Sequence, residues 1–296
     1  MPKPKLIISF AVVVLMAALF LPAQSVKKLA GAETQPAQVY DENPPPAIEA
    51  KGGLAVDFVT GKTLYEKNKS DKLPLASVTK IISLLAIMDR VGPDEAVEIS
   101  ENAVLTPEPS SLRAGEHLKA KDLIAMAMTE SSNDAVSALV EHTAKKYSVP
   151  PEDMDEWFLG LMRAKAASLG SPNMIFYDPT GLDVDESLSG AYGSAEELLS
   201  FAKAALSSPL WQFGDLKAVI SAEGFEHNLI TTNELYPKLT NFVGAKTGYT
   251  DLAGGNLLTI IEYPLGNPVG IVVLGSSKDG RFLDTQRILE WIKTSR

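Results

Sequence analysis

The sequence predicts an α+β fold: an antiparallel sheet flanked by helices, with an inserted and mostly helical lobe. Two observations lead to this prediction. Strand patterns lie near both ends of the folded part of the chain, over residues 54–65 and 241–275, with helical patterns between them. The late strands are separated only by short turns containing Gly and Pro, and connections this short require antiparallel pairing. We therefore expect a functional site in a cleft between the sheet and the helical lobe.

The first elements are a hairpin and a run of helices. Residues 54–59 and 63–65 read as strands on either side of a Gly-containing turn. Helices are expected over residues 77–90, 120–129, 133–145, 151–169 and 194–206. Pro151 and Gly170 mark the two ends of the fourth helix. The fifth opens with the capping box Ser194-Ala195-Glu196-Glu197.

Strands return in the last part of the chain. Residues 241–249, 256–263 and 268–275 are rich in β-forming side chains. A final helix over residues 279–293 follows, and we expect it to cover the sheet. Its predicted buried face consists of Phe282, Ile288, Leu289 and Ile292.

The N-terminus differs from the rest of the chain. Residues 1–25 combine two early lysines, an uncharged apolar run over residues 6–21 and small residues at Ala23 and Ser25. This pattern is typical of a signal peptide or an N-terminal membrane anchor, and either would export the protein to the periplasm or the outer face of the cell membrane. Residues 26–46 form a Pro-rich linker, which leaves residues 47–296 as one folded domain.

Composition excludes several classes of function. The chain has 27 Lys and Arg against 37 Asp and Glu, and a net charge of −10 argues against nucleic acid as a partner. Because there is no cysteine, a disulfide scaffold, a thiolate nucleophile and a Cys-ligated zinc are excluded. The three histidines never occur four residues apart, so a helical two-histidine metal site is excluded as well. We expect no metal and no cofactor.

The first chemical motif is Ser77-Val78-Thr79-Lys80, at the start of an apolar helix. A helix N-terminus exposes unpaired N–H groups beside the hydroxyl, and Lys80 lies one turn further on the same face. A lysine without its proton can activate such a serine. The same spacing recurs at Ser25–Lys28, in the targeting segment, and at Ser200–Lys203, in the middle of a helix. Neither recurrence exposes its serine at a helix start.

The second motif is Ser131-Ser132-Asn133, at the junction of two predicted helices. A polar side chain at this junction can point into a cleft, and the Asn133 amide can both donate to and accept from a peptide. A simple helix N-cap by Ser131 or Ser132 is the alternative interpretation.

The third motif is Lys246-Thr247-Gly248, followed by Tyr249, in a predicted strand. A strand edge can pair with an extended peptide, and a lysine and a threonine hydroxyl there can hold a terminal carboxylate. Gly248 leaves room for close approach. The alternative is an exposed hairpin lysine beside a turn.

Together, these motifs resemble the D-alanyl-D-alanine carboxypeptidase family of serine peptidases, the low-molecular-weight penicillin-binding proteins. The resemblance covers residues 47–293 in the family's order. It extends to Leu112-Arg113-Ala114-Gly115-Glu116, Ser132-Asn133-Asp134-Ala135, Asp178-Pro179-Thr180-Gly181-Leu182 and Lys246-Thr247-Gly248-Tyr249-Thr250. It implies a β-lactamase/transpeptidase-like fold, a serine D,D-peptidase domain over residues 47–296, and a role in building the cell wall.

The resemblance also implies a role for each motif residue. Ser77 would be the nucleophile, Lys80 its general base and Ser131 a proton relay. Asn133 would orient the substrate amide. Lys246 and Thr247 would bind the terminal carboxylate, with Gly248 beside them, and the N–H groups of Ser77 and Tyr249 would form the oxyanion hole.

Several functions remain open at this point. The resemblance implies release of the terminal D-alanine from peptidoglycan stem peptides, with β-lactams as covalent inhibitors. A D,D-endopeptidase that cuts peptidoglycan cross-links would use the same motifs. A β-lactamase is disfavoured because no Glu-x-x-Leu-Asn segment is present. A catalytically silent wall-binding protein is the alternative from another class, and it would gain nothing from a serine beside a base.

Overall fold

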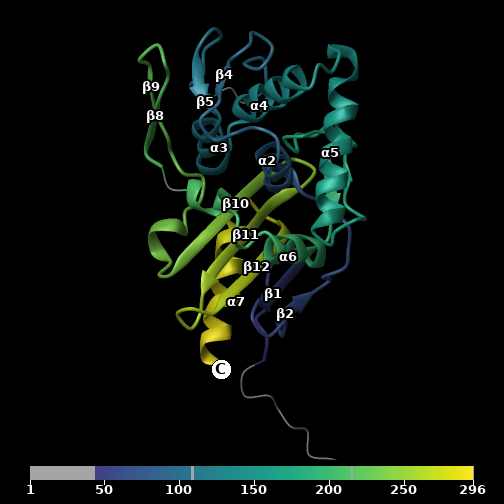
Figure 1. The fold of residues 1–296 in the computed structure, drawn as a ribbon. Coiled ribbons are helices and arrows are strands. Elements are labelled where there is room, and N and C mark those ends of the chain that lie inside the picture. Colours follow the sequence, from purple (N-terminus) through teal and green to yellow (C-terminus); the bar gives the residue numbers. More distant parts are fainter. Residues whose placement is uncertain (1–43, 108–109, 215, 296) are drawn as a thin grey trace, which may run out of the picture. The chain divides into compact units, whose positions relative to one another are not determined.

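The centre of the fold is a five-stranded antiparallel sheet (Figure 1), in a computed structural model that describes residues 44–107, 110–214 and 216–295. Its strands follow the order β10 (Phe242–Thr250), β11 (Gly254–Glu262), β12 (Pro268–Ser276), β1 (Gly52–Asp57) and β2 (Thr63–Lys67). Strands β1 and β12 pair from Gly52↔Leu274 to Asp57↔Val269. The N-terminal hairpin thus completes a sheet that the last three strands begin, and the predicted α+β class is confirmed.

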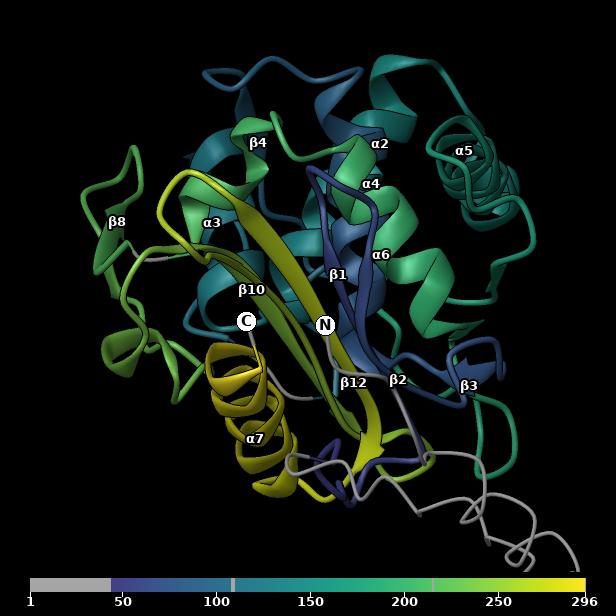
Figure 2. The same ribbon diagram turned by 90° about the horizontal axis from the view of Figure 1, so that it is seen from below.

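Both faces of this sheet are covered (Figure 2). Helix α7 (Gly280–Thr294) lies on one face, and α6 (Ala195–Ala204) with the helical lobe lies on the other. Alternate strand residues serve the two sides: Val273 packs in the cluster that contains Ile288 of α7, whereas Val272 packs in the cluster of the helical lobe. The predicted buried face of the final helix is confirmed, with Phe282, Ile288, Leu289 and Ile292 all at most 4 % exposed.

The helical lobe has the predicted elements with small shifts at their ends. It contains α2 (Lys80–Met88), α3 (Ala120–Thr129), α4 (Asn133–Lys146) and α5 (Met154–Ser168). The helix predicted over residues 77–90 starts instead as a 3₁₀ turn, η2 (Ala76–Thr79), and becomes α-helical at Lys80. The predicted capping box is confirmed at the start of α6, where the Ser194 hydroxyl accepts from Glu197 N–H and the Glu197 carboxylate accepts from Ser194 N–H.

Several very short strands were not predicted. They pair as β3 (Leu73–Pro74) with β7 (Ala191–Gly193), β7 with β6 (Ile175–Phe176), β4 (Ala96–Glu98) with β5 (His117–Lys119), and β8 (Ala218–Ile220) with β9 (Glu226–Asn228). The 3₁₀ turns η3 (Pro151–Asp153), η4 (Pro209–Phe213) and η5 (Tyr236–Lys238) complete the described elements. Segments of two or three residues are too short to show a period in sequence.

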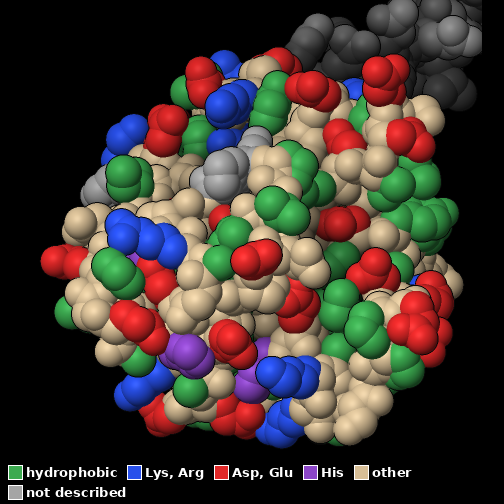
Figure 3. Space-filling model, turned by 90° about the horizontal axis from the view of Figure 1, so that it is seen from above, with side chains coloured by type: hydrophobic (Ala, Val, Ile, Leu, Met, Phe, Trp, Pro, Cys, Tyr) green, Lys and Arg blue, Asp and Glu red, His purple; other side chains and the backbone are tan. Residues whose placement is uncertain are grey.

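The predicted targeting segment, residues 1–25, lies outside the described residues, as does the linker up to residue 43. Within the described ranges, no helix combines the length and apolar character that crossing a membrane requires. On the face seen in Figure 3, acidic and basic side chains mix on one side, whereas the other side carries mainly acidic ones.

Candidate active site

Ser77 and Lys80 form the centre of the site. The Lys80 Nζ lies 2.7 Å from the Ser77 Oγ, and the lysine is fully buried. Its ammonium also donates to Asn133 Oδ1 at 2.7 Å and to the Thr180 carbonyl at 2.9 Å. An ammonium has three protons to donate, so these contacts fix the direction of each one. The sequence-based placement of Ser77 and Lys80 on one face is confirmed.

Residues 178–182 pack against the turn that carries Ser77. Ala76 has a positive φ of 48°, which is costly for a residue with a Cβ and is found mostly where surrounding structure enforces it. A Cβ on Gly181 would lie 2.0 Å from the Ala76 carbonyl oxygen, so only glycine permits this approach. Asp178 Oδ1 accepts from the N–H groups of Thr180 and Gly181 at 2.7 and 2.8 Å. The Asp-Pro-Thr-Gly-Leu segment therefore positions the Thr180 carbonyl against Lys80.

Ser131 and Ser132 have different roles. The Ser132 hydroxyl accepts from Ala135 N–H at 3.1 Å and caps α4, so the N-cap interpretation holds for Ser132. Ser131 has a positive φ of 66°, which turns its side chain away from the cap. Its hydroxyl instead accepts from Lys246 Nζ at 2.8 Å. Of the two serines, Ser131 is therefore the one that contacts Lys246.

Lys246 is a buried lysine in β10, which corrects the alternative of an exposed hairpin lysine. It is 1 % exposed and donates to Ser131 Oγ and, at 2.9 Å, to the Thr247 carbonyl. Burial lowers the pKa of the Lys246 ammonium well below its ordinary value, and the positive charges of Lys80 and Arg281 lower that pKa further. A lysine in this environment can exchange a proton with the hydroxyl beside it.

Strand β10 lies directly against the turn that carries Ser77. A Cβ on Gly248 would lie 3.1 Å from the Ser77 nitrogen and 2.9 Å from the Leu75 carbonyl oxygen. Arg281, from the start of α7, donates to the Gly248 carbonyl at 2.7 Å. This contact holds the strand so that the backbone of Gly248 and Tyr249 lies beside Ser77.

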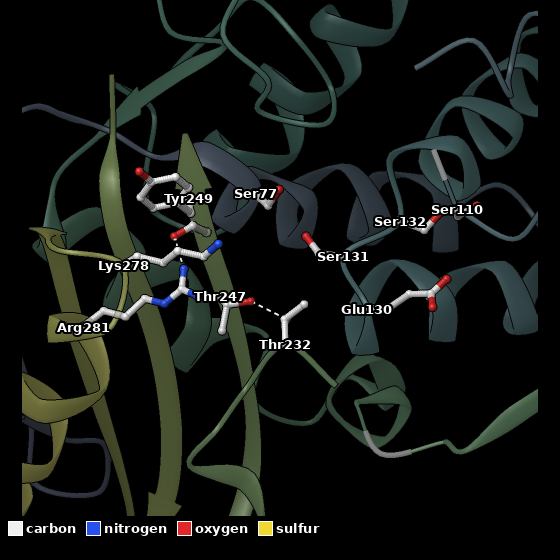
Figure 4. A pocket seen from close by; sticks show the side chains of 11 residues that line it. Ser77, Ser110, Glu130, Ser131, Ser132, Thr232, Thr247, Tyr249, Lys278 and Arg281 are labelled. Atoms are coloured by element: carbon white, nitrogen blue, oxygen red, sulfur yellow. Dashed lines mark hydrogen bonds between the residues drawn. The ribbon is translucent and has the colours of Figure 1, made fainter. Parts of the chain in front are cut away.

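These groups open into one pocket of about 330 Å³ (Figure 4). Five of the predicted site residues line it: Ser77, Ser131, Thr247, Gly248 and Tyr249. The other three are buried behind the lining, where Lys80 contacts Ser77 and Asn133, and Lys246 contacts Ser131. Sequence reasoning missed Ser110, Glu130, Thr232, Lys278 and Arg281, which also line the pocket. The Thr232 and Thr247 hydroxyls lie 2.6 Å apart.

The missed residues come from segments without a motif. Ser110 and Thr232 lie in loops. Nothing in the local sequence separates Arg281 from the other arginines, and only the folded structure brings it into contact with the Gly248 carbonyl. Glu130 directly precedes Ser131. Burial and, as the smaller cause, the negative charge of Asp134 raise the pKa of the Glu130 carboxyl to about 7. Only its position beside the second motif could have drawn attention to Glu130.

A serine beside a buried lysine, a second serine–lysine pair and a backbone edge for an extended peptide form an arrangement suited to a serine hydrolase. The chain belongs to the D-alanyl-D-alanine carboxypeptidase family, peptidase family S11, whose model matches residues 38–278. It is thus a serine peptidase, and the resemblance of its three motifs to this family is confirmed.

Comparisons with individual proteins agree with this assignment. The chain is 29 % identical to the D-alanyl-D-alanine endopeptidase of Escherichia coli, over 99 % of this chain and 90 % of that protein. It is 27 % identical to the D-alanyl-D-alanine carboxypeptidase DacC of the same organism, over 83 % of this chain and 62 % of that protein. The fold resembles the ampicillin-bound penicillin-binding protein D2 of Listeria monocytogenes, with a TM-score of 0.68, 23 % identity and coverage of 84 % of this chain and 99 % of that one.

Proposed function

We propose that this serine peptidase is a D-Ala-D-Ala carboxypeptidase that removes the terminal D-alanine from peptidoglycan stem peptides. The observation that carries the proposal is the 2.7 Å contact between Ser77 Oγ and the buried Lys80 Nζ, inside a pocket bordered by the edge of β10. The family and the carboxypeptidase relatives support it.

In the proposed reaction, Lys80 first loses one proton, and its neutral Nζ then takes the proton of Ser77 Oγ as that oxygen attacks the carbonyl carbon of the penultimate D-alanine. The developing oxyanion would lie between the N–H groups of Ser77 and Tyr249, and one such donor is typically worth about 3 kcal/mol of barrier. The C–N bond then breaks as the leaving nitrogen receives a proton through Ser131, which Lys246 supports at 2.8 Å. Water completes the cycle by displacing Ser77 from the acyl group.

The leaving D-alanine ends in a carboxylate, which needs donors at the far side of Ser131. Thr247 and Thr232, with hydroxyls 2.6 Å apart, supply them, and the buried Arg281 adds positive charge. Asn133, which accepts from Lys80 at 2.7 Å, is left with its amide N–H₂ to donate to the substrate.

Covalent labelling tests the acyl-enzyme. The full-length protein is incubated with a penicillin, and the peptide containing Ser77 is analysed by mass spectrometry. We expect a stable adduct that is lost in Ser77→Ala. The matched control is Ser200→Ala, which removes the serine of the other Ser-x-x-Lys spacing in the described residues and should still form the adduct. If no adduct forms at any concentration, the acyl-enzyme mechanism is wrong, and a silent wall-binding protein becomes the better explanation.

A D,D-endopeptidase is the second candidate function. It is favoured by the relative named endopeptidase, which this chain matches over 90 % of that protein's length. Products separate the two activities: a carboxypeptidase releases free D-alanine from a pentapeptide, whereas an endopeptidase releases monomers from a cross-linked dimer.

We also propose that residues 1–25 export the protein and either leave as a signal peptide or stay as a membrane anchor. The basic start and the apolar run over residues 6–21 support this. Intact mass measurement on protein from cell fractions tests it. An N-terminus near residue 26 in the periplasmic fraction, or the uncut chain in the membrane fraction, would agree, and uncut chain in the cytoplasm would contradict export.

A further inference from the structure

Glu130 is an acidic side chain in the pocket that the proposed reaction does not use. It ends α3, where its N–H donates to the Met126 carbonyl at 3.1 Å, and its side chain lines the pocket beside Ser131. Its Oε1 is buried and has no hydrogen-bond partner among the residues that the structure describes. Because the Glu130 side chain lines the pocket, its carboxyl group is a hydrogen-bond acceptor that a ligand in the pocket can use.

The neighbouring acid is already satisfied. Asp134 accepts from Ser110 N–H at 2.8 Å and from the Ser110 hydroxyl at 3.0 Å, and its other oxygen accepts from Thr106. Of these two carboxylates, Glu130 is therefore the one with an oxygen left to accept from a ligand. This part of the pocket thus offers a hydrogen-bond acceptor.

The position of Glu130 defines which end of a substrate it can meet. Thr232, whose hydroxyl contacts Thr247, donates its N–H to the carbonyl of Thr129 at 3.0 Å, one residue before Glu130. Figure 4 shows Ser131 between Ser77 and Glu130, and the lining continues to Ser110 and Ser132. Glu130 thus adjoins the end of the pocket that would hold the leaving group, beyond the threonines that would bind the D-alanine carboxylate.

The two candidate substrates differ at this end. The leaving group of a pentapeptide is a single D-alanine, which ends at its carboxylate. The leaving group of a cross-link is a second stem peptide, which continues further and carries amide N–H groups. We propose that Glu130 is a specificity-determining residue that accepts hydrogen bonds from amide N–H groups of this second stem peptide and so favours the cleavage of cross-links. This inference rests on the proposed acyl-enzyme function and assigns a substrate preference to it.

The test compares two reactions in the full-length protein. The kcat/KM for D-alanine release from a pentapeptide and for cleavage of a cross-linked dimer are measured in wild type, Glu130→Ala and Glu130→Gln. A hydrogen bond to a charged group is worth roughly a 10- to 100-fold change in affinity, so dimer cleavage by Glu130→Ala should fall by that factor, mainly through KM. Its D-alanine release should fall by no more than about threefold, because a single D-alanine does not reach this group. Glu130→Gln keeps one acceptor oxygen and should lose less.

Glu290→Gln, an exposed position on α7, is the matched control and should leave both reactions as in wild type. The inference is overturned if both kcat/KM values of Glu130→Ala fall by the same factor, if neither falls, or if the wild type does not cleave the dimer. Penicillin labelling of Ser77 in the same preparations separates this failure from failure of the proposed function. If Ser77 forms the adduct but Glu130→Ala changes both reactions equally, only the role of Glu130 is refuted. If the wild type forms no adduct, the acyl-enzyme mechanism is refuted.

Discussion

Replacing Gly248 with alanine tests the contact between β10 and the turn that carries the nucleophile. The added methyl would lie 2.9 Å from the Leu75 carbonyl oxygen and 3.1 Å from the nitrogens of Ser77 and Val78. These are backbone atoms, which cannot rotate away. Ordinary contact begins at 3.4 Å, so the strand or the turn must retreat by about 0.5 Å.

That displacement separates the two N–H groups proposed as the oxyanion hole. A 1 Å misplacement can cost about 100-fold in rate, and loss of one oxyanion donor costs roughly 100- to 1,000-fold. We therefore expect acylation by a fluorescent penicillin to slow by about 30- to 300-fold in Gly248→Ala. Overpacking should also lower the free energy of unfolding by about 1–3 kcal/mol.

The matched control is Gly160→Ala, in the middle of α5, where the nearest atom is a flexible arginine nitrogen at 3.8 Å. It should acylate at the wild-type rate and gain roughly 0.5–1 kcal/mol from helix propensity. If Gly248→Ala acylates within threefold of wild type while folded, the strand does not constrain the reacting geometry and the reasoning is refuted.

Three further predictions concern buried charge. The pKa of Glu130 is raised to about 7 against an ordinary 4.5, so the fold favours the protonated carboxyl, and the cost of burying the charged form is absent below pH 4.5 and complete above pH 7. After discounting for the partial exposure of Glu130, we expect Glu130→Gln to stabilise the protein by about 1–2 kcal/mol at pH 8 and by almost nothing at pH 4.5, as measured by urea unfolding. Equal effects at both pH values would contradict this. Lys246→Met removes a buried charge, so Tm in calorimetry should stay level or rise while acylation falls by roughly 100-fold or more; a clear fall in Tm would show that Lys246 supports the fold. The His227 Nε2 lies 2.8 Å from the Glu116 carboxylate, and both side chains are 2 % exposed. His227→Ala should therefore lower the free energy of unfolding in urea by about 3 kcal/mol. A loss below about 1 kcal/mol would mean that the pair is not stabilising.

The sheet and its neighbouring helices were predictable because their patterns are long. Strands of nine residues such as β10 and helices such as α3 show a clear period, and punctuation by glycine, proline and a capping box placed their ends within a few residues. The pairing of β1 with β12 is different in kind. It joins segments about 200 residues apart, and no local pattern specifies it.

The site divides in the same way. Ser77 and Lys80 are three residues apart, so helical spacing alone brings them together. Arg281 and Thr232 reach the pocket only because the sheet and a long loop place them there, and their local sequence carries no sign of it. The backbone strain at Ala76 could not be predicted either, since no sequence pattern there indicates a positive φ. Local chemistry could be predicted from the sequence, whereas groups assembled by tertiary packing could not.

The position of β12 between β1 and β11 has a consequence for the timing of activity. During synthesis, Ser77 leaves the ribosome about 200 residues before Arg281, which at ordinary rates is a delay of roughly 10–40 s. Throughout that interval the first hairpin has no sheet to join, and a two-stranded hairpin alone is marginally stable. Neither the edge of β10 nor its support from α7 yet exists beside the nucleophile. The order of the strands thus leaves the pocket beside Ser77 incomplete until the last helix has been synthesised.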